Sequence, residues 1–169
     1  MILQARLNPP SADKRELAYR GVVFREGDRV MQTKNNYDLA WEKVDGSEGM
    51  GIFNGDIGTV TSIEHSREFM RIVFDDREVK YDFTLLEELE HAYAITVHKS
   101  QGSEYPVVVI PVYSCPPMLR TRNLLYTAIT RARNIAVLVG REDILGDMVE
   151  NVRQVLRYTY LREHIKNER

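Results

Sequence analysis

The sequence predicts an α/β fold in which a small β-barrel is inserted into a partial parallel-sheet domain. Residues 22–83 alternate short apolar segments with turn residues, and this spacing is typical of a small barrel. The apolar runs 106–112 and 135–140 flank a segment with helical periodicity, an order typical of a parallel α/β sheet. We therefore assign residues 22–83 to the barrel, and residues 1–21 together with 84–169 to the sheet domain.

The chain begins with the end of a helix. Ile2, Leu3 and Leu7 lie near helical spacing, and Asn8 followed by two prolines ends the helix. Because a helix that ends this early indicates preceding residues, we expect the sequence to be part of a longer protein. Residues 11–20 are charged, and we expect a loop or an extended crossing there.

Short strands separated by turns follow. Turn residues cluster at 26–28, 54–56 and 75–76, and the stretch 34–51 is rich enough in Asn, Asp and Gly to predict a loop. The side chains of this part are ordinary for a barrel, so its chemistry indicates a structural role. The expected strands are 22–24, 29–33, 57–63, 69–74 and 78–82.

In the last part of the chain, an expected strand at 92–96 leads into a polar loop. The elements expected after that loop are a strand at 106–112, a helix at 119–133, a strand at 135–140 and a helix at 147–161. The first of these helices has one apolar face, formed by Leu124, Leu125, Ala128, Ile129 and Ala132.

The bulk composition limits the class of protein. Hydrophobic residues make up 43% of the chain, which is enough for a core. The net charge of -2 gives no overall basic bias, so any surface that binds nucleic acid must be local. The single cysteine, Cys115, excludes a disulfide within the chain and suits a reducing cytoplasm. No stretch approaches the ~18 apolar residues of a membrane span, so we expect no membrane partner.

Residues 96–104 form a segment whose composition packing does not explain, with Thr, His, Lys, Ser, Gln and Glu within nine positions. The hydroxyl of Thr96, the imidazole of His98 and the loop amides are suitable partners for phosphate, and Gly102 permits close approach of the backbone. Structural roles are the alternatives. In these alternatives His98 is a surface histidine, Thr96 is a helix N-cap and Glu104 is a solvated turn residue.

These residues carry a family resemblance. Thr96–Glu104 resembles motif V of superfamily-1 DNA helicases in its RecD-like form, and Leu124–Arg133 resembles motif VI of the same superfamily. Gly27–Tyr37 and Asn54–Gly58 are similar to the SH3-like barrel inserted in RecD-like helicases. The resemblance covers residues 22 to 140. It implies half of a RecA-like motor domain, of the P-loop NTPase type, that carries an SH3-like insertion.

By this resemblance Arg131 is the catalytic arginine finger, an always-charged, planar group that stabilises charge on a transferring γ-phosphoryl. Gly102 and Glu104 would bind the nucleotide together with Arg131. Thr96, His98 and Lys99 would contact single-stranded DNA. The structural alternative for Arg131 is an exposed helix arginine, like its neighbours Arg120, Arg122 and Arg133.

The resemblance also implies a cofactor and partners. The chain would be the C-terminal part of a helicase, as in the alpha subunit of exodeoxyribonuclease V or a UvrD-like helicase C-terminal domain. ATP with Mg²⁺ would be the cofactor, and translocation on single-stranded DNA would run 5′ to 3′. No Gly-x-x-x-x-Gly-Lys-Ser/Thr loop occurs in the 169 residues, so an N-terminal RecA-like domain would supply the metal and most phosphate contacts. We therefore expect these residues alone not to hydrolyse ATP.

Two interpretations of other classes remain open at this point. The chain is compatible with a non-catalytic module that binds DNA or protein, and with an interaction subunit beside nucleases in an exodeoxyribonuclease V-type complex. DNA binding by the barrel itself rests on scattered residues, for which a solvated surface is the simpler explanation. They are Arg29, Lys34, Tyr37, Arg67 and Arg71.

Overall fold

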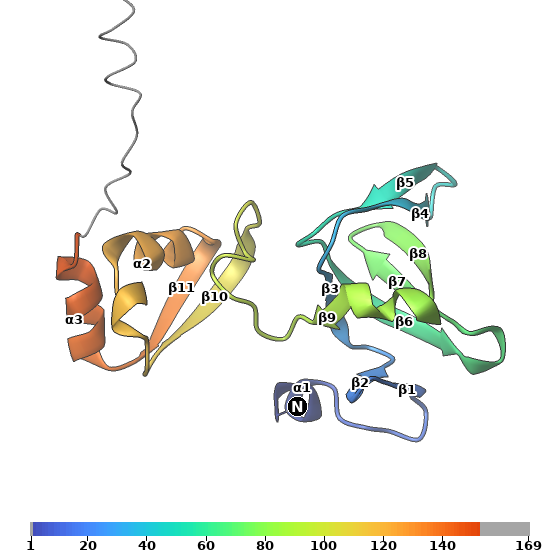
Figure 1. Ribbon diagram of the computed structural model, residues 1–169, viewed down its shortest axis with the longest axis horizontal. Coiled ribbons are helices and arrows are strands. Elements are labelled where there is room, and N and C mark those ends of the chain that lie inside the picture. The colour runs from blue at the N-terminus through green and yellow to red at the C-terminus, as the bar shows by residue number, and fades with distance from the viewer. Residues whose placement is uncertain (1, 153–169) are drawn as a thin grey trace, which may run out of the picture. The chain divides into compact units, whose positions relative to one another are not determined.

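The structure, a computed structural model, describes residues 2–152. They belong to two compact units that meet between Lys99 and Ser100 (Figure 1). No helix among the described residues is long and apolar enough to span a membrane. The expected helix at 147–161 extends beyond the described residues, and only its start can be compared.

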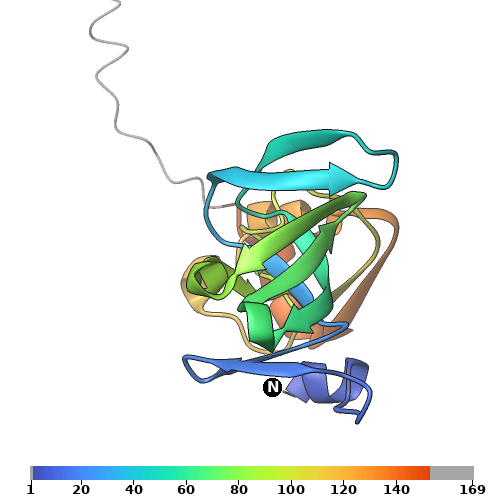
Figure 2. The ribbon, with the colours of Figure 1, turned by 90° about the vertical axis from the view of Figure 1, so that its right-hand side faces the viewer.

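Unit 1 is built on one antiparallel sheet of seven strands in the order β5-β4-β8-β7-β6-β3-β9. Figure 2 shows this sheet curling upon itself, which fits an SH3-like barrel. The short helices η1 (His65–Arg67) and η2 (Phe83–Glu88) connect its strands. The strands are β3 (Arg29–Gln32), β4 (Asn36–Lys43), β5 (Glu48–Ile52), β6 (Ile57–Glu64), β7 (Phe69–Phe74), β8 (Arg77–Asp82) and β9 (Leu89–His91).

Four of the five expected barrel strands are confirmed as β3, β6, β7 and β8. The prediction of a loop over 34–51 is wrong, because β4 and β5 occupy most of it. The polar residues that suggested a loop are on the solvent side, while Leu39 and Ile52 are buried. The core of the barrel is formed by Phe24, Val30, Leu39, Ile52, Val60, Ile63, Met70, Ile72, Phe74, Val79, Tyr81, Leu86 and Leu89.

The N-terminal segment also belongs to unit 1. Helix α1 (Ile2–Leu7) precedes a hairpin of β1 (Glu16–Tyr19) and β2 (Val22–Arg25), which lies at one end of the curled sheet (Figures 1 and 2). The expected barrel strand at 22–24 is thus part of this separate hairpin. The compact units divide the chain between residues 99 and 100. The assignment of residues 1–21 and 84–169 to one motor domain stays a prediction.

Unit 2 is a parallel β-α-β arrangement followed by a helix. Strands β10 (Tyr105–Val112) and β11 (Ala132–Gly140) pair in parallel, and η3 (Pro117–Leu119) and α2 (Arg122–Ile129) lie between them in the chain. Helix α3 (Glu142–Glu150) completes the described part. The helices cover the sheet through a small core of Val112, Leu125, Ile144 and Met148.

The expected order of strand, helix and strand is confirmed in unit 2, but helix α2 is shorter than the predicted 119–133. The helix begins after Thr121, whose hydroxyl accepts a hydrogen bond from the amide of Leu124 at 3.3 Å. Residue 132 already belongs to β11. The predicted strand at 92–96 is absent, because the chain leaves the sheet after β9 and continues without regular structure to the turn at 97–102.

A buried carboxylate ties the parts of unit 1 together. Asp28 is fully buried just before β3. It accepts hydrogen bonds from the side chains of Gln4 (2.7 Å), Asn8 (2.7 Å), His91 (3.0 Å) and Tyr93 (2.7 Å) and from the amide of Arg25 (2.8 Å). These partners come from α1 and the residue after it, the end of β2, and the segment that leads to residue 96. One side chain therefore holds three chain segments against the start of β3.

The hydrogen bonds keep this carboxylate ionised. Burial alone would raise the pKa of Asp28, but the bonds from His91, Tyr93, Asn8 and the Arg25 amide outweigh it and lower the pKa to about 2. Burial and the bond to the Asp28 carboxylate raise the pKa of Tyr93 to about 12. Tyr93 therefore stays a hydrogen-bond donor at neutral pH.

We predict a stability contribution from Asp28 that depends on pH. Because the folded pKa lies below the ordinary 3.8, the carboxylate stabilises the fold above pH ~4, and this contribution is lost as the pH falls towards ~2. Asp28→Asn should lower the free energy of unfolding at pH 7 by at least about 2 kcal/mol. Urea unfolding from pH 7 to pH 3 should show the two proteins converging.

The exposed Asp38 provides a matched control on the same sheet. Asp38→Asn should change the free energy of unfolding by less than about 0.5 kcal/mol at every pH. A difference between wild type and Asp28→Asn that does not vary with pH would contradict the proposed ionisation of Asp28.

Candidate functional site

The predicted site residues divide between the two units. Thr96, His98 and Lys99 lie at the end of unit 1, whereas Gly102, Glu104 and Arg131 lie in unit 2. The two groups are therefore described separately.

The first group lies in an exposed turn. The hydroxyl of Thr96 accepts a hydrogen bond from the amide of Lys99 at 3.3 Å, as a capping residue does, and its own proton can still be donated. His98 is exposed. The ammonium of Lys99 pairs with the carboxylate of Glu90, and both side chains are partly exposed. Such a pair is worth little in water, so a phosphate can replace the carboxylate.

The barrel contributes to the surroundings of this turn. Gly55 lies in the turn between β5 and β6, and a Cβ atom there would be 3.8 Å from the carbonyl oxygen of Lys99. The Gly55 amide donates to the carbonyl of Gln32 at 2.9 Å, which fixes this turn on β3. The sequence indicated a turn at 54–56, but nothing in it predicted that the turn would lie beside Lys99.

Gly102 ends the turn in a left-handed conformation. Its φ is +85°, and an added Cβ would meet no atom within 4 Å. The backbone conformation therefore explains this glycine, because residues with a Cβ rarely adopt it. The close backbone approach that we predicted for Gly102 remains a prediction.

Arg131 is a half-buried, well-positioned side chain rather than a solvated one. It follows α2, and its guanidinium donates to the carbonyl of Thr127 (3.2 Å), the carbonyl of Ser103 (3.1 Å) and the hydroxyl of Thr130 (3.4 Å). A guanidinium has five N–H donors, so these bonds leave two. The backbone also holds this end of α2, since the amide of Tyr105 donates to the Arg131 carbonyl at 2.8 Å.

Glu104 lies beside the same contacts. It follows Ser103, whose carbonyl Arg131 binds, and its carboxylate forms an exposed ion pair with Arg133 at 3.4 Å. The structure therefore brings Glu104 and Arg131 to the same edge of unit 2, where β10 and β11 begin. Arg133, which the sequence placed on the predicted helix, lies in β11 and is the partner of Glu104.

This edge suits part of a nucleotide. Two remaining guanidinium donors fit a phosphate oxygen, and an exposed carboxylate accepts hydrogen bonds from hydroxyl groups such as those of a ribose. Among residues 2–152, no three His, Cys, Asp or Glu side chains lie close enough together to hold a metal ion. The edge thus offers groups for a nucleotide's phosphate and sugar.

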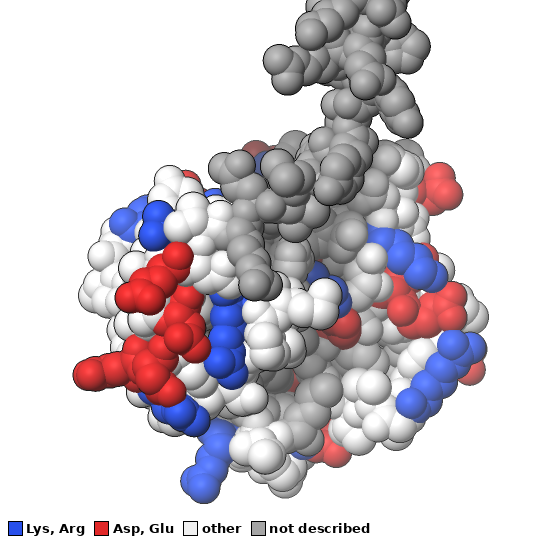
Figure 3. All heavy atoms as spheres, turned by 60° about the vertical axis from the view of Figure 1, so that its left-hand side comes forward, with Lys and Arg blue, Asp and Glu red and all other residues white. Residues whose placement is uncertain are grey.

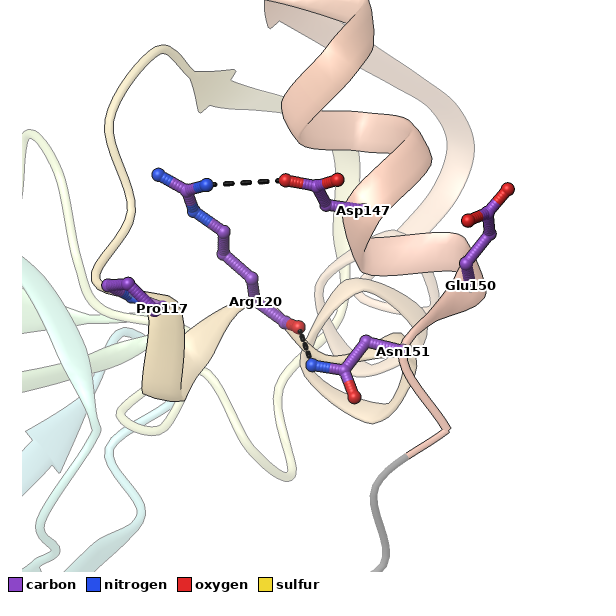
Figure 4. Close-up of a pocket in the computed structure, with 5 residues that line it drawn as sticks. All are labelled: Pro117, Arg120, Asp147, Glu150 and Asn151. Atoms are coloured by element: carbon purple, nitrogen blue, oxygen red, sulfur yellow. Dashed lines mark hydrogen bonds and ion pairs between the residues drawn. The ribbon is translucent and has the colours of Figure 1, made fainter.

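A cavity of about 440 Å³ lies elsewhere in unit 2, between η3 and α3. It is lined by Pro117, Arg120, Asp147, Glu150 and Asn151, and none of the predicted site residues contributes to it. Figure 4 shows the Arg120 guanidinium facing Asp147, at 3.3 Å. Two carboxylates and an already paired arginine make this cavity a poor setting for a polyphosphate, so we do not assign the nucleotide to it.

The charged surface is mixed. On the face in Figure 3, acidic side chains lie beside basic ones. The net charge of -2 likewise gives no overall basic field, so a DNA contact on this face must depend on particular side chains.

The contacts of Arg131 and Arg133 predict different effects on stability. Arg131→Ala removes bonds to two backbone carbonyls and should lower the free energy of unfolding by about 1–3 kcal/mol. Arg133→Ala removes one exposed ion pair and should cost less than about 0.5 kcal/mol. Urea unfolding of both variants measures the difference, and equal small effects would show that Arg131 is not held as described.

Two protein families match the chain. Residues 1–74 match the SH3 domain of ATP-dependent RecD-like DNA helicases, and residues 91–139 match the UvrD-like helicase C-terminal domain. These matches confirm the resemblance to RecD-like helicases and the SH3-like nature of the barrel.

Curated relatives agree with the family matches. An ATP-dependent RecD2 DNA helicase of Deinococcus radiodurans is 36% identical over 132 residues, which cover 78% of this chain and 16% of that protein. A RecBCD enzyme subunit RecD of Mycolicibacterium smegmatis is 33% identical over 140 residues, which cover 83% of this chain and 22% of that protein. The chain thus spans less than a quarter of the length of these two relatives.

Solved structures show a related fold. The crystal structure of Bacteroides Pif1 bound to ssDNA matches 99% of this chain and 43% of that chain, with a TM-score of 0.54 and 18% identity. At this identity the likeness concerns the fold alone. Together the comparisons relate both units to DNA helicases.

Proposed function

We propose that this chain, related through both of its units to RecD-like DNA helicases, is the C-terminal part of an ATP-dependent helicase that moves 5′ to 3′ on single-stranded DNA. The observation that carries the proposal is the position of Arg131. Its guanidinium is held by Ser103, Thr127 and Thr130, with two donors left, beside the exposed carboxylate of Glu104. An immobilised arginine with unused donors is what an arginine finger requires.

In this proposal the residues of unit 2 act on the nucleotide. Arg131 stabilises negative charge on the transferring γ-phosphoryl, and Glu104 accepts hydrogen bonds from ribose hydroxyls after exchanging its partner Arg133. Gly102 shapes the turn before Glu104. ATP with Mg²⁺ is the proposed cofactor, and the metal and most phosphate contacts come from an N-terminal RecA-like domain of the same protein.

The residues of unit 1 act on DNA. Thr96, His98 and Lys99 present a hydroxyl, an imidazole and an ammonium on one exposed turn, and these groups are common partners of phosphate. Gly102 ends the turn at 97–102, so only a short stretch of chain separates the residues proposed to bind DNA from those proposed to bind the nucleotide. A change at the nucleotide can therefore be transmitted to the DNA contacts through this stretch. Helicases of this kind act on DNA in the cytoplasm, and the free thiol of Cys115 suits that compartment.

The exposed sheet of unit 2 supports a larger motor domain. Val107, Val109, Ile135 and Val137 are apolar but exposed in β10 and β11. Parallel strands are normally buried on both faces, so further strands and helices of a RecA-like domain are expected to cover them. Under this proposal residues 2–152 hold only part of the sheet, and the 169-residue sequence contains no phosphate-binding loop, so these residues alone do not hydrolyse ATP.

Replacing Arg131 in the full-length helicase tests the proposed catalytic role. Arg131→Ala should lower DNA-stimulated kcat for ATP hydrolysis by about 10³–10⁵-fold, the usual contribution of an arginine finger. The affinity for single-stranded DNA should change less than about twofold, because DNA binds through other residues. Arg131→Lys keeps a positive charge but not the planar fork, and it should restore little activity.

Arg133→Ala is the matched control for this experiment, since it removes a neighbouring guanidinium whose contact is one exposed ion pair. It should retain most ATP hydrolysis. The finger is wrongly assigned if Arg131→Ala keeps both ATP hydrolysis and DNA binding, or if Arg133→Ala is equally impaired.

A second candidate function follows from the relatives named as RecBCD subunits. In this alternative the chain is a non-catalytic DNA- or protein-binding module beside nuclease subunits in an exodeoxyribonuclease V-type complex. The two functions differ in the Arg131→Ala experiment, because a non-catalytic module needs no arginine finger.

A further inference from the structure

Two exposed aromatic rings stand out on the barrel. Tyr37 and Phe53 are 65% and 42% exposed, and their ring centroids are 5.7 Å apart with an interplanar angle of 73°. Exposed aromatic side chains lose little conformational freedom on binding and offer large apolar faces, which makes such pairs typical of binding sites.

A bulge and a left-handed glycine in the backbone next to the pair set the direction of both rings. The pairing of β4 with β5 shifts register between Asn36 and Ala40, so Tyr37 lies in a bulge. Opposite it, Gly51 has a φ of +97°, and a Cβ there would be 3.1 Å from the ring of Phe53. Bulges and left-handed glycines re-aim neighbouring side chains, often at functional sites.

A side chain also fixes both ends of the pair. The amide nitrogen of Asn35 donates to the Tyr37 hydroxyl at 3.3 Å, and its oxygen accepts from the backbone amide of Asn54 at 3.0 Å. The Phe53 amide donates to Asp56 at 3.1 Å. The rings are therefore held in place on the surface, although neither is needed for the core.

Gly55 links the pair to the turn that we propose to bind DNA. Phe53 is two residues from Gly55, and Gly55 lies against the carbonyl of Lys99. The nearby acidic groups are mostly paired with cations, with Glu90 bound to Lys99. The other such pairs are Asp56 with Arg77 at 3.3 Å and Glu87 with Lys34 at 3.6 Å.

From this geometry we propose that Tyr37 and Phe53 form a stacking site for bases of single-stranded DNA, next to phosphate contacts from Thr96, His98 and Lys99. Two ring faces at a steep angle fit successive unstacked bases, and stacking needs no strong positive field. The inference rests on the proposed function, because it extends the DNA contact of the motif V turn onto the barrel.

The test compares two oligonucleotides in fluorescence anisotropy with the full-length helicase. One is a labelled oligothymidylate, and the other has the same backbone with abasic sites in place of bases. Tyr37→Ala with Phe53→Ala should weaken binding of the oligothymidylate by roughly 5- to 100-fold and leave the abasic oligonucleotide unaffected. Tyr37→Phe keeps the ring and should bind like wild type.

Two control variants separate stacking from other effects. Met50→Ala removes an exposed apolar side chain of the same hairpin and should change neither affinity. Lys99→Ala should weaken binding of both oligonucleotides and reduce the slope of log affinity against log salt by ~0.7, as one lost phosphate contact does. Circular dichroism of the aromatic variants should show the wild-type fold.

The outcomes distinguish this inference from the proposed function. If wild type binds neither oligonucleotide, the proposed function fails and the stacking site fails with it. If wild type binds DNA and the double alanine variant binds the oligothymidylate as tightly as wild type does, only the stacking site is overturned, and the rings then serve a protein partner or none.

Discussion

The buried carboxylate of Asp28 is the interaction on which the rest of unit 1 depends. Five hydrogen bonds bring helix α1 with the residue after it, the end of strand β2, and residues 91–93 at the end of β9 to the start of β3. A buried charge is tolerated only when its hydrogen-bonding capacity is satisfied, so these partners are obligatory and their geometry is specific. Because Tyr93 is one of them, the network also sets where the chain leaves the barrel, four residues before the turn at 97–102.

After Thr96, the positions of the candidate site residues are set by the backbone of residues 96–103. The turn exposes Thr96, His98 and Lys99, the left-handed Gly102 redirects the chain, and Ser103 offers its carbonyl to Arg131. Within unit 2, the guanidinium and the carboxylate of Glu104 then lie at one edge of the parallel strands. The proposed function requires Arg131 and Glu104 to lie close together, because the arginine finger and the carboxylate that binds the ribose must contact the same nucleotide.

Apolar periodicity, turn residues and capping residues predicted the helices and strands that short stretches of sequence determine. The Val-rich strands β10 and β11, the helix capped by Thr121 and the hairpin strands around 57–63 and 69–74 were all evident from periodicity. The strand β4 was missed because its buried side is carried by few residues, chiefly Leu39. Asp28 was taken for an ordinary turn residue, because partners 24 and 63 positions away are not visible in sequence. The sequence does not show the contacts of Arg131 either, and its role as an arginine finger remains a proposal that rests on resemblance.

The central claim is that Arg131 acts on the transition state of phosphoryl transfer, and a transition-state analogue tests it most directly. The measurement is the affinity of the full-length helicase, bound to single-stranded DNA, for ADP alone and for ADP with aluminium fluoride. The account predicts that Arg131→Ala binds ADP like wild type but loses the tighter binding of the aluminium fluoride complex. Equal affinity of wild type and Arg131→Ala for that complex would contradict it.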